Sequence, residues 1–304
     1  MSFGMMEALL SFFRRQVGLR TDTADVGGSL HAKLKQMGVV LQEVSALPPL
    51  LEPFFGNDPL SNITISSNSS LSDGYIHRYN NLTVNAGITL NVNKSIILVK
   101  DTLTVNGLIS ASGKGGLGGL KPGTGDTQPG QDGYGYAGAG GGGGWGYSSY
   151  GKNGGSTLHK VGGSGGAPIG GGQAGGWYVN LPAALFWDMS DYIINACGAG
   201  GGASGRDGDY YNPGGDGGGS IMLFARKINV NSSGAIRADG IDGGEYSPVG
   251  GGGGGGGGLI YILAMEELVI DGVVSASGGS GGRPANYDWG GNGGNGCVTK
   301  VVLS

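Results

Sequence analysis

The sequence contains few charged residues and few residues with reactive side chains. Only 13 % of its 304 residues are charged, its net charge is −4, and it has two cysteines and three histidines. Two cysteines cannot build a disulfide framework, so we expect Cys197 and Cys297 to be small buried residues. The histidines show no metal-ligand spacing, and the charge balance does not indicate a nucleic acid partner. We therefore expect no metal, no cofactor and no nucleic acid.

Long hydrophobic runs are also missing. No stretch reaches the ~18 continuous apolar residues of a transmembrane helix, so no membrane insertion is predicted. The apolar residues between Met5 and Phe13 are interrupted by Glu7, and Arg14 and Arg15 follow them. A secretory signal carries its positive charges before the apolar run, so this order argues against a signal peptide.

The sequence has no recognisable catalytic motif. Glycoside hydrolysis needs two carboxylates at a defined separation, and no pattern singles out a pair among Asp188, Asp191, Glu245 and Asp288. The aspartates within 207–216 follow neither the EF-hand spacing nor the Gly-Gly-x-Gly-x-Asp repeat of calcium-binding proteins. We therefore expect a protein that is not an enzyme.

Glycine is what the sequence has in excess. It supplies 72 residues, several times its usual share of ~7 %. Disorder is disfavoured because 38 % of the residues are hydrophobic and because the glycines lie between regular apolar runs. No strict Gly-X-Y period is present, so a collagen triple helix is excluded.

The first fifty residues have a helical pattern. Residues 1–17 form a short amphipathic stretch, and Ser29 is a candidate N-cap for a second helix that ends before Pro48. The apolar residues of this second helix are spaced by four and three, as in a coiled-coil seam. They are Leu30, Leu34, Met37, Leu41 and Val44. Two interpretations remain: the helix packs on its own domain, or it joins copies of the chain, as a trimer.

From Asn62 onward the apolar residues alternate with a period of two, in short segments rich in β-branched residues. The phrase Leu103–Gly107 recurs at Leu268–Gly272, which suggests a scaffold of stacked strands that is solenoid-like or hairpin-like. Several asparagines lie in Asn-x-Ser/Thr triplets, where we expect turns with left-handed backbone instead of glycosylation. They are Asn62, Asn68, Asn81, Asn93 and Asn231.

Glycine-rich excursions interrupt the strand pattern at Gly198–Gly219, Gly240–Gly258 and Gly278–Gly296, with a longer one at Gly113–Gly176. Such segments bury little apolar area, so only backbone hydrogen bonds and close packing can order them. A bundle of polyproline-II helices permits both. We expect each shorter excursion to be a hairpin of two legs, each spanning about 25 Å at ~3.1 Å per residue.

The centres of these excursions are not glycine but aromatic and polar. Tyr and Trp supply contact area at low entropic cost, so loop ends of this kind are typical of a recognition surface. The alternative is that the aromatics only cover the ends of the bundle. The predicted receptor-binding residues are Tyr147, Tyr150, Tyr210, Tyr211, Asn212, Tyr246, Tyr287, Asp288 and Trp289.

In these features, over Gly113–Leu303, the chain resembles the polyglycine-rich adhesins at the ends of phage long tail fibres. The resemblance implies a polyproline-II bundle whose variable aromatic loops bind receptors on the bacterial surface. Residues Thr23–Lys33 look like the opening of tail proteins in phages or prophages of Gram-positive hosts. The β-rich stretch at 62–112 and the coiled-coil pattern depart from the adhesins and favour a self-assembling spike or fibre subunit.

We therefore predict a mainly β fold with a short N-terminal helical part and a glycine-rich polyproline-II bundle. The expected divisions are a helical attachment segment at 1–50, a β-rich stem at 51–112 and the bundle with strand returns at 113–304. The predicted function is a non-enzymatic, trimeric tail-fibre adhesin of the virion or another extracellular surface. It would bind other tail or baseplate proteins through its N-terminus and a host glycan or protein through its loops. The alternatives are a structural filament subunit, a glycan-degrading tailspike and an ice-binding protein.

Overall fold

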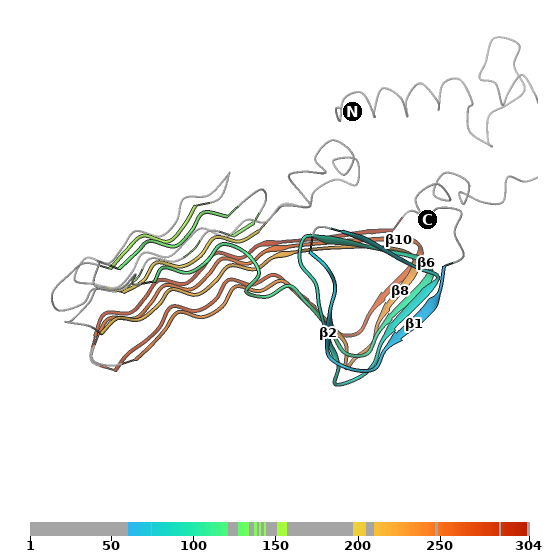
Figure 1. Ribbon diagram of the computed structural model, residues 1–304, viewed down its shortest axis with the longest axis horizontal. Coiled ribbons are helices and arrows are strands. Elements are labelled where there is room, and N and C mark those ends of the chain that lie inside the picture. Colours follow the sequence, from blue (N-terminus) through green and yellow to red (C-terminus); the bar gives the residue numbers. More distant parts are fainter. Residues whose placement is uncertain are drawn as a thin grey trace, which may run out of the picture. The chain divides into compact units, whose positions relative to one another are not determined.

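A computed structural model describes residues 60–73, 75–120, 127–133, 137–138, 140, 143, 151–156, 197–204, 210–246, 249–285 and 287–302 (Figure 1). These residues belong to one compact unit of the chain. The predicted helices of segment 1–50, with the seam from Leu30 to Val44, lie outside the described residues. In the described ranges, no helix has the length and apolar character needed to cross a lipid bilayer.

The described part is mainly β, as the alternating pattern predicts, and its strands lie in two parallel sheets. The larger sheet contains β1 (Asn62–Ile65), β3 (Ile76–Tyr79), β4 (Asn81–Val84), β6 (Ser95–Val105), β8 (Ser220–Val230), β10 (Leu259–Ile270) and β12 (Cys297–Val302). The smaller sheet contains β2 (Ser69–Ser70), β5 (Thr89–Asn91), β7 (Leu108–Ser110), β9 (Ala235–Arg237) and β11 (Val273–Ser275).

The chain alternates between the two sheets and adds a strand to each as it proceeds. The order is β1-β4-β6-β8-β10-β12 in one sheet and β2-β5-β7-β9-β11 in the other. Every described strand pair is parallel, so the hairpin-like version of the scaffold is wrong for these strands. Strands from the predicted segments 51–112 and 113–304 lie side by side in the same sheets (Figure 1).

Columns of apolar side chains form the core between the sheets. In a parallel sheet, residues in register point to the same face, so one column can be followed from strand to strand. Leu82 pairs in register with Leu103, which pairs with Ile228, and all three are fully buried. The period of two in the sequence therefore places one apolar set in the core.

Asparagines connect successive passes of the chain at the turns. Asn80 and Asn81 both donate from Nδ2 to Asn62 Oδ1, at 2.8 and 2.9 Å. Asn231 donates to Asn106 Oδ1 at 2.6 Å. The expected left-handed backbone is wrong, because Lys94 is the only described non-glycine residue with a positive φ. These asparagines lie at the starts of strands or in turns, and their side-chain amides bond between layers.

The first halves of β8 and β10 are buried on both faces. Ile221 and Leu223 face the core, while Met222 and Tyr261, which are in register with each other, lie on the opposite face and are also buried. The ring of Tyr261 stacks on that of Phe224 at 5.9 Å. Burial raises the pKa of Tyr261 from 10.0 to about 12.

We predict that the folded state loses stability as the pH rises from 10 to 12. The raised pKa means that folded Tyr261 keeps its proton in this range, whereas the unfolded chain releases it, which favours unfolding. Urea denaturation below pH 10 and between pH 10 and 12 measures the loss. Tyr261→Phe should reduce it without abolishing it, because burial also raises the pKa of Tyr79. An undiminished alkaline loss in this variant would contradict the assignment.

Candidate functional site

Three glycine-rich hairpins extend from one junction between the two sheets (Figure 1). The first hairpin, described at 197–204 and 210–219, leads into β8. The second, at 238–246 and 249–258, joins β9 to β10, and the third, at 276–285 and 287–296, joins β11 to β12. They start side by side, because Leu259 N donates to Gly219 O at 3.0 Å and Ala238 N donates to Ser275 O at 2.9 Å.

Backbone hydrogen bonds join the two legs of each hairpin at every third residue. In the second hairpin, Gly252 N donates to Gly244 O at 2.8 Å and Gly255 N donates to Ile241 O at 2.9 Å. The same antiparallel spacing occurs in the other two hairpins. The donor and acceptor pairs are Gly198 and Gly218, Gly201 and Gly215, Gly290 and Gly282, Gly293 and Gly279, and Gly296 and Ala276.

The leg at 251–258 bonds to neighbours on all sides. Its N–H groups point in three directions in turn: Gly251 and Gly254 donate to the third hairpin, Gly252 to its own partner leg, and Gly253 and Gly256 to the first hairpin. Its carbonyl groups accept from further segments. The neighbours are segments 199–202, 215–218, 238–244, 279–282 and 288–294, together with Gly138 and Cys297.

Where a leg lies at the edge of the hairpins, side-chain oxygens replace backbone carbonyl groups as acceptors for its N–H groups. Asp242 Oδ1 accepts from Ser280 N at 2.6 Å, Asn292 Oδ1 accepts from Gly281 N at 2.9 Å, and Asn295 Oδ1 accepts from Gly278 N at 3.0 Å. We missed these residues in the sequence. The signal was present, because in several legs polar or aromatic residues recur at every third position. Examples are Asp239, Asp242 and Glu245, then Ser277, Ser280 and Arg283, then Trp289, Asn292 and Asn295.

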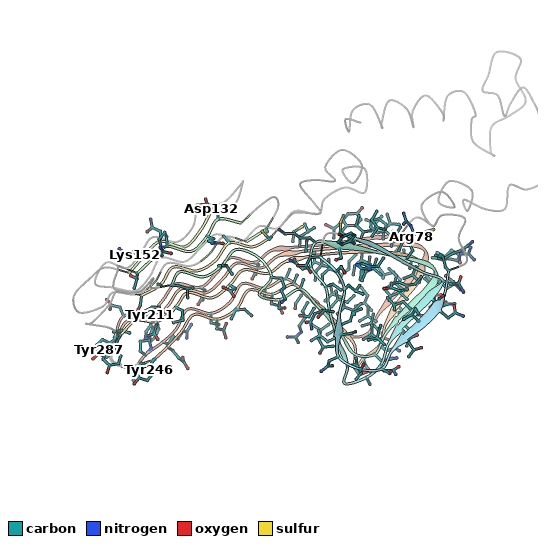
Figure 2. The ribbon with its side chains drawn as sticks, in the orientation of Figure 1. Arg78, Asp132, Lys152, Tyr211, Tyr246 and Tyr287 are labelled. Atoms are coloured by element: carbon teal, nitrogen blue, oxygen red, sulfur yellow. The ribbon has the colours of Figure 1, made fainter. Side chains whose placement is uncertain are left out.

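The hairpin ends present the predicted aromatic residues to solvent. Tyr210, Tyr246 and Trp289 are 56, 66 and 55 % exposed, while Tyr211 and Tyr287 are half-buried. Figure 2 shows Tyr211, Tyr246 and Tyr287 near the same end of the hairpins. The half-buried Asp288 lies beside Trp289, whereas Tyr147 and Tyr150 lie outside the described residues.

Contacts between hairpins hold these ends together. The rings of Tyr210 and Tyr246, from the first and second hairpins, stack with centroids 6.4 Å apart. The second hairpin bonds to the third where Gly251 N donates to Asp288 O at 2.8 Å. Within the third, the Arg283 guanidinium lies 5.1 Å from the ring centroid of Trp289, a cation–π geometry. The three joined ends therefore carry an aromatic surface, in which the Tyr210–Tyr246 stack links the first two hairpins.

Asn212 lies beneath this surface and is only 1 % exposed. Its Oδ1 accepts from Tyr246 N at 2.7 Å, and its Nδ2 donates to Tyr246 O at 2.7 Å and to Gly250 O at 2.9 Å. The side chain thus bonds the second hairpin to the first through the backbone of Tyr246. This burial gives Asn212 a structural role, so we leave it out of the contact surface.

The described residues contain no group of three or more His, Cys, Asp or Glu side chains that could hold a metal ion. Cys197 and Cys297 are buried and form no disulfide, as we expected of small buried residues. No protein-family model, curated protein or solved structure significantly matches this chain.

We predict that Gly254→Ala destabilises the protein by about 1–3 kcal/mol or more. An added Cβ would overlap the carbonyl oxygen of Gly279, and a backbone atom cannot rotate away as a side chain can. Urea denaturation of the full chain measures the effect. Ser280→Ala, at an exposed position of the facing leg, is the matched control and should change the free energy of unfolding by no more than about 0.5 kcal/mol. Equal effects would contradict the packing argument.

Asn212→Ala should also destabilise the protein, by about 1–3 kcal/mol, because it leaves backbone groups of Tyr246 and Gly250 without partners. We expect a weaker near-ultraviolet circular dichroism signal from tyrosine, since the Tyr210–Tyr246 stack loosens. The control is Asn295→Ala, which removes one exposed hydrogen bond. If both variants behave alike, Asn212 does not hold the hairpin ends.

Proposed function

We propose that this protein is a non-enzymatic phage tail-fibre or spike adhesin that binds a host cell-surface receptor through the ends of its hairpins. The observation that carries the proposal is that Tyr210, Tyr246 and Trp289 come from three different hairpins and are all more than half exposed. The ends that carry them bond to one another. Large exposed aromatic side chains on a rigid support are the residues that most often dominate a binding interface.

The support beneath the surface favours recognition over a purely structural role. Backbone bonds fix the hairpin legs at every third residue, and the buried Asn212 fixes Tyr246 through both its N–H and its C=O. A loop that is already ordered loses little conformational entropy when it binds. The aromatic surface is therefore built to bind without rearrangement.

We further propose that the hairpin legs are polyproline-II helices and that the two sheets are the walls of a parallel β-solenoid. A helix with three residues per turn turns its N–H groups toward three neighbours in succession, as the donors of 251–258 do. The solenoid is supported by the two parallel sheets, to which each pass of the chain adds a strand.

The chemistry of the surface suits a glycan or a protein receptor. Aromatic faces pack on the apolar faces of sugars, and nearby carboxylates such as those of Glu245 and Asp288 accept hydrogen bonds from hydroxyl groups. Arg283 adds a planar donor beside Trp289. In this proposal segment 1–50 forms the trimer and attaches it to other tail or baseplate proteins.

Replacing Tyr246, Tyr287 and Trp289 by Ala should abolish adsorption to bacterial cells while leaving the fold intact. Each truncation at a dominant contact costs about 2 kcal/mol or more, so we expect binding to weaken by at least roughly 30-fold. The measurement is adsorption of the fluorescently labelled full chain to the strains, among a panel of Gram-positive and Gram-negative bacteria, that the unmodified protein binds.

The matched control for this experiment is a variant with Leu117, Leu120 and Ile241 truncated to Ala. These residues are also exposed but do not belong to the ends of the three hairpins. It should adsorb like the unmodified protein, and circular dichroism should show both variants folded. The proposal is wrong if the first variant adsorbs as well as the unmodified protein, or if the control loses adsorption to the same extent.

A further inference from the structure

One column of residues crosses the larger sheet and has a basic side chain at each end. His77 pairs in register with Ile97, Ile97 with Leu223, Leu223 with Ile262, and Ile262 with Lys300. The three residues between the ends are fully buried in the core. Because residues in register share a face, Lys300 stands at a position that faces the core.

The sheet end that contains Lys300 is otherwise suited to accept another strand. β12 and β11 are the last strands of their sheets, so each has an edge without a paired strand in the described part of the chain. The apolar residues around this end are only partly covered, and Val302 is 42 % exposed. The others are Leu268, Ile270, Val274 and Val298. Unpaired edges with apolar neighbours attract further strands.

We propose that Lys300 prevents a second copy of this chain from stacking on this end of the sheets, so that assembly stays discrete instead of continuing into a filament. A charged residue that faces inward on an edge strand opposes strand addition, because pairing would bury its charge. The proposal concerns assembly and is independent of what the hairpin ends bind.

Both geometries of stacking would bury the ammonium group of Lys300 without a carboxylate to neutralise its charge. If copies stacked head to tail, Lys300 would meet the end of the column that carries His77, another basic side chain. If two C-terminal sheet ends met, two Lys300 side chains would face each other. Lys300 takes part in none of the ion pairs between described residues, which are Arg226–Glu266, Lys227–Glu267 and Arg237–Asp239.

Position 300 is the one charged residue among the neighbouring core-facing positions that the structure describes at this end of the larger sheet. Val298 lies in register with Ile260, and Val302 with Ala264, so the columns on either side of Lys300 end in apolar residues. The stem of a lysine can cover such neighbours while its ammonium group stays in water. An apolar residue at position 300 would complete a continuous apolar end.

The test compares the full-length protein with Lys300→Ile, Lys300→Met and Lys300→Arg by sedimentation velocity over a range of concentrations and by negative-stain electron microscopy. We expect both apolar variants to form end-to-end stacks of increasing length, at a protein concentration at least about tenfold below any at which the unmodified chain associates. Lys300→Arg keeps the positive charge at the end and should stay discrete.

The matched control is Lys227→Ile, which makes the same substitution at an exposed position of β8 away from the sheet end. It should keep the mass of the unmodified protein, whether that is a monomer or a trimer. The proposal is overturned if neither apolar variant that folds forms stacks, if the control stacks equally, or if the unmodified protein is itself an open filament.

Discussion

The hairpins depend on the close approach of bare backbones. At most of the described glycines of the legs, a carbonyl oxygen or another backbone atom of a neighbouring segment occupies the place that a Cβ would need, as Gly256 O does at Gly198 and Gly279 O does at Gly254. This distance lets each leg bond on several sides. Glycine loses more conformational freedom on folding than any other residue, and the dense network of backbone bonds offsets that loss.

The two sheets make this network possible. A single glycine-rich leg has no partners and would stay unfolded, but β9 to β12 start and end the second and third hairpins in register. Neighbouring strands lie about 4.8 Å apart, which is also a suitable spacing for bonded legs. The apolar core thus fixes where the hairpins start. The bonds between the legs keep that arrangement along their length, so the loops at the hairpin ends are held in fixed positions.

The local parts of this arrangement could be predicted from the sequence. The period of two in the apolar residues predicts the strands, and the apolar runs on either side of the glycine-rich stretches predict the hairpins. The parallel pairing of β6 with β8 could not be predicted, because it joins residues such as Val99 and Ala225 across a long excursion. The burial of Asn212 and the inward position of Lys300 depend on which distant strands pair and in which register. Neither can therefore be predicted from the local sequence pattern.

The second and third hairpins enter and leave the sheets in the same way, and this has an evolutionary consequence. The stretch from Ala238 to Ser275 holds one hairpin, one strand of the larger sheet and one strand of the smaller sheet. A tandem duplication of this stretch would insert a complete layer and leave the last strand, with Lys300, in place. Such a chain would gain one loop for each duplication, so its valency could grow by a single genetic event.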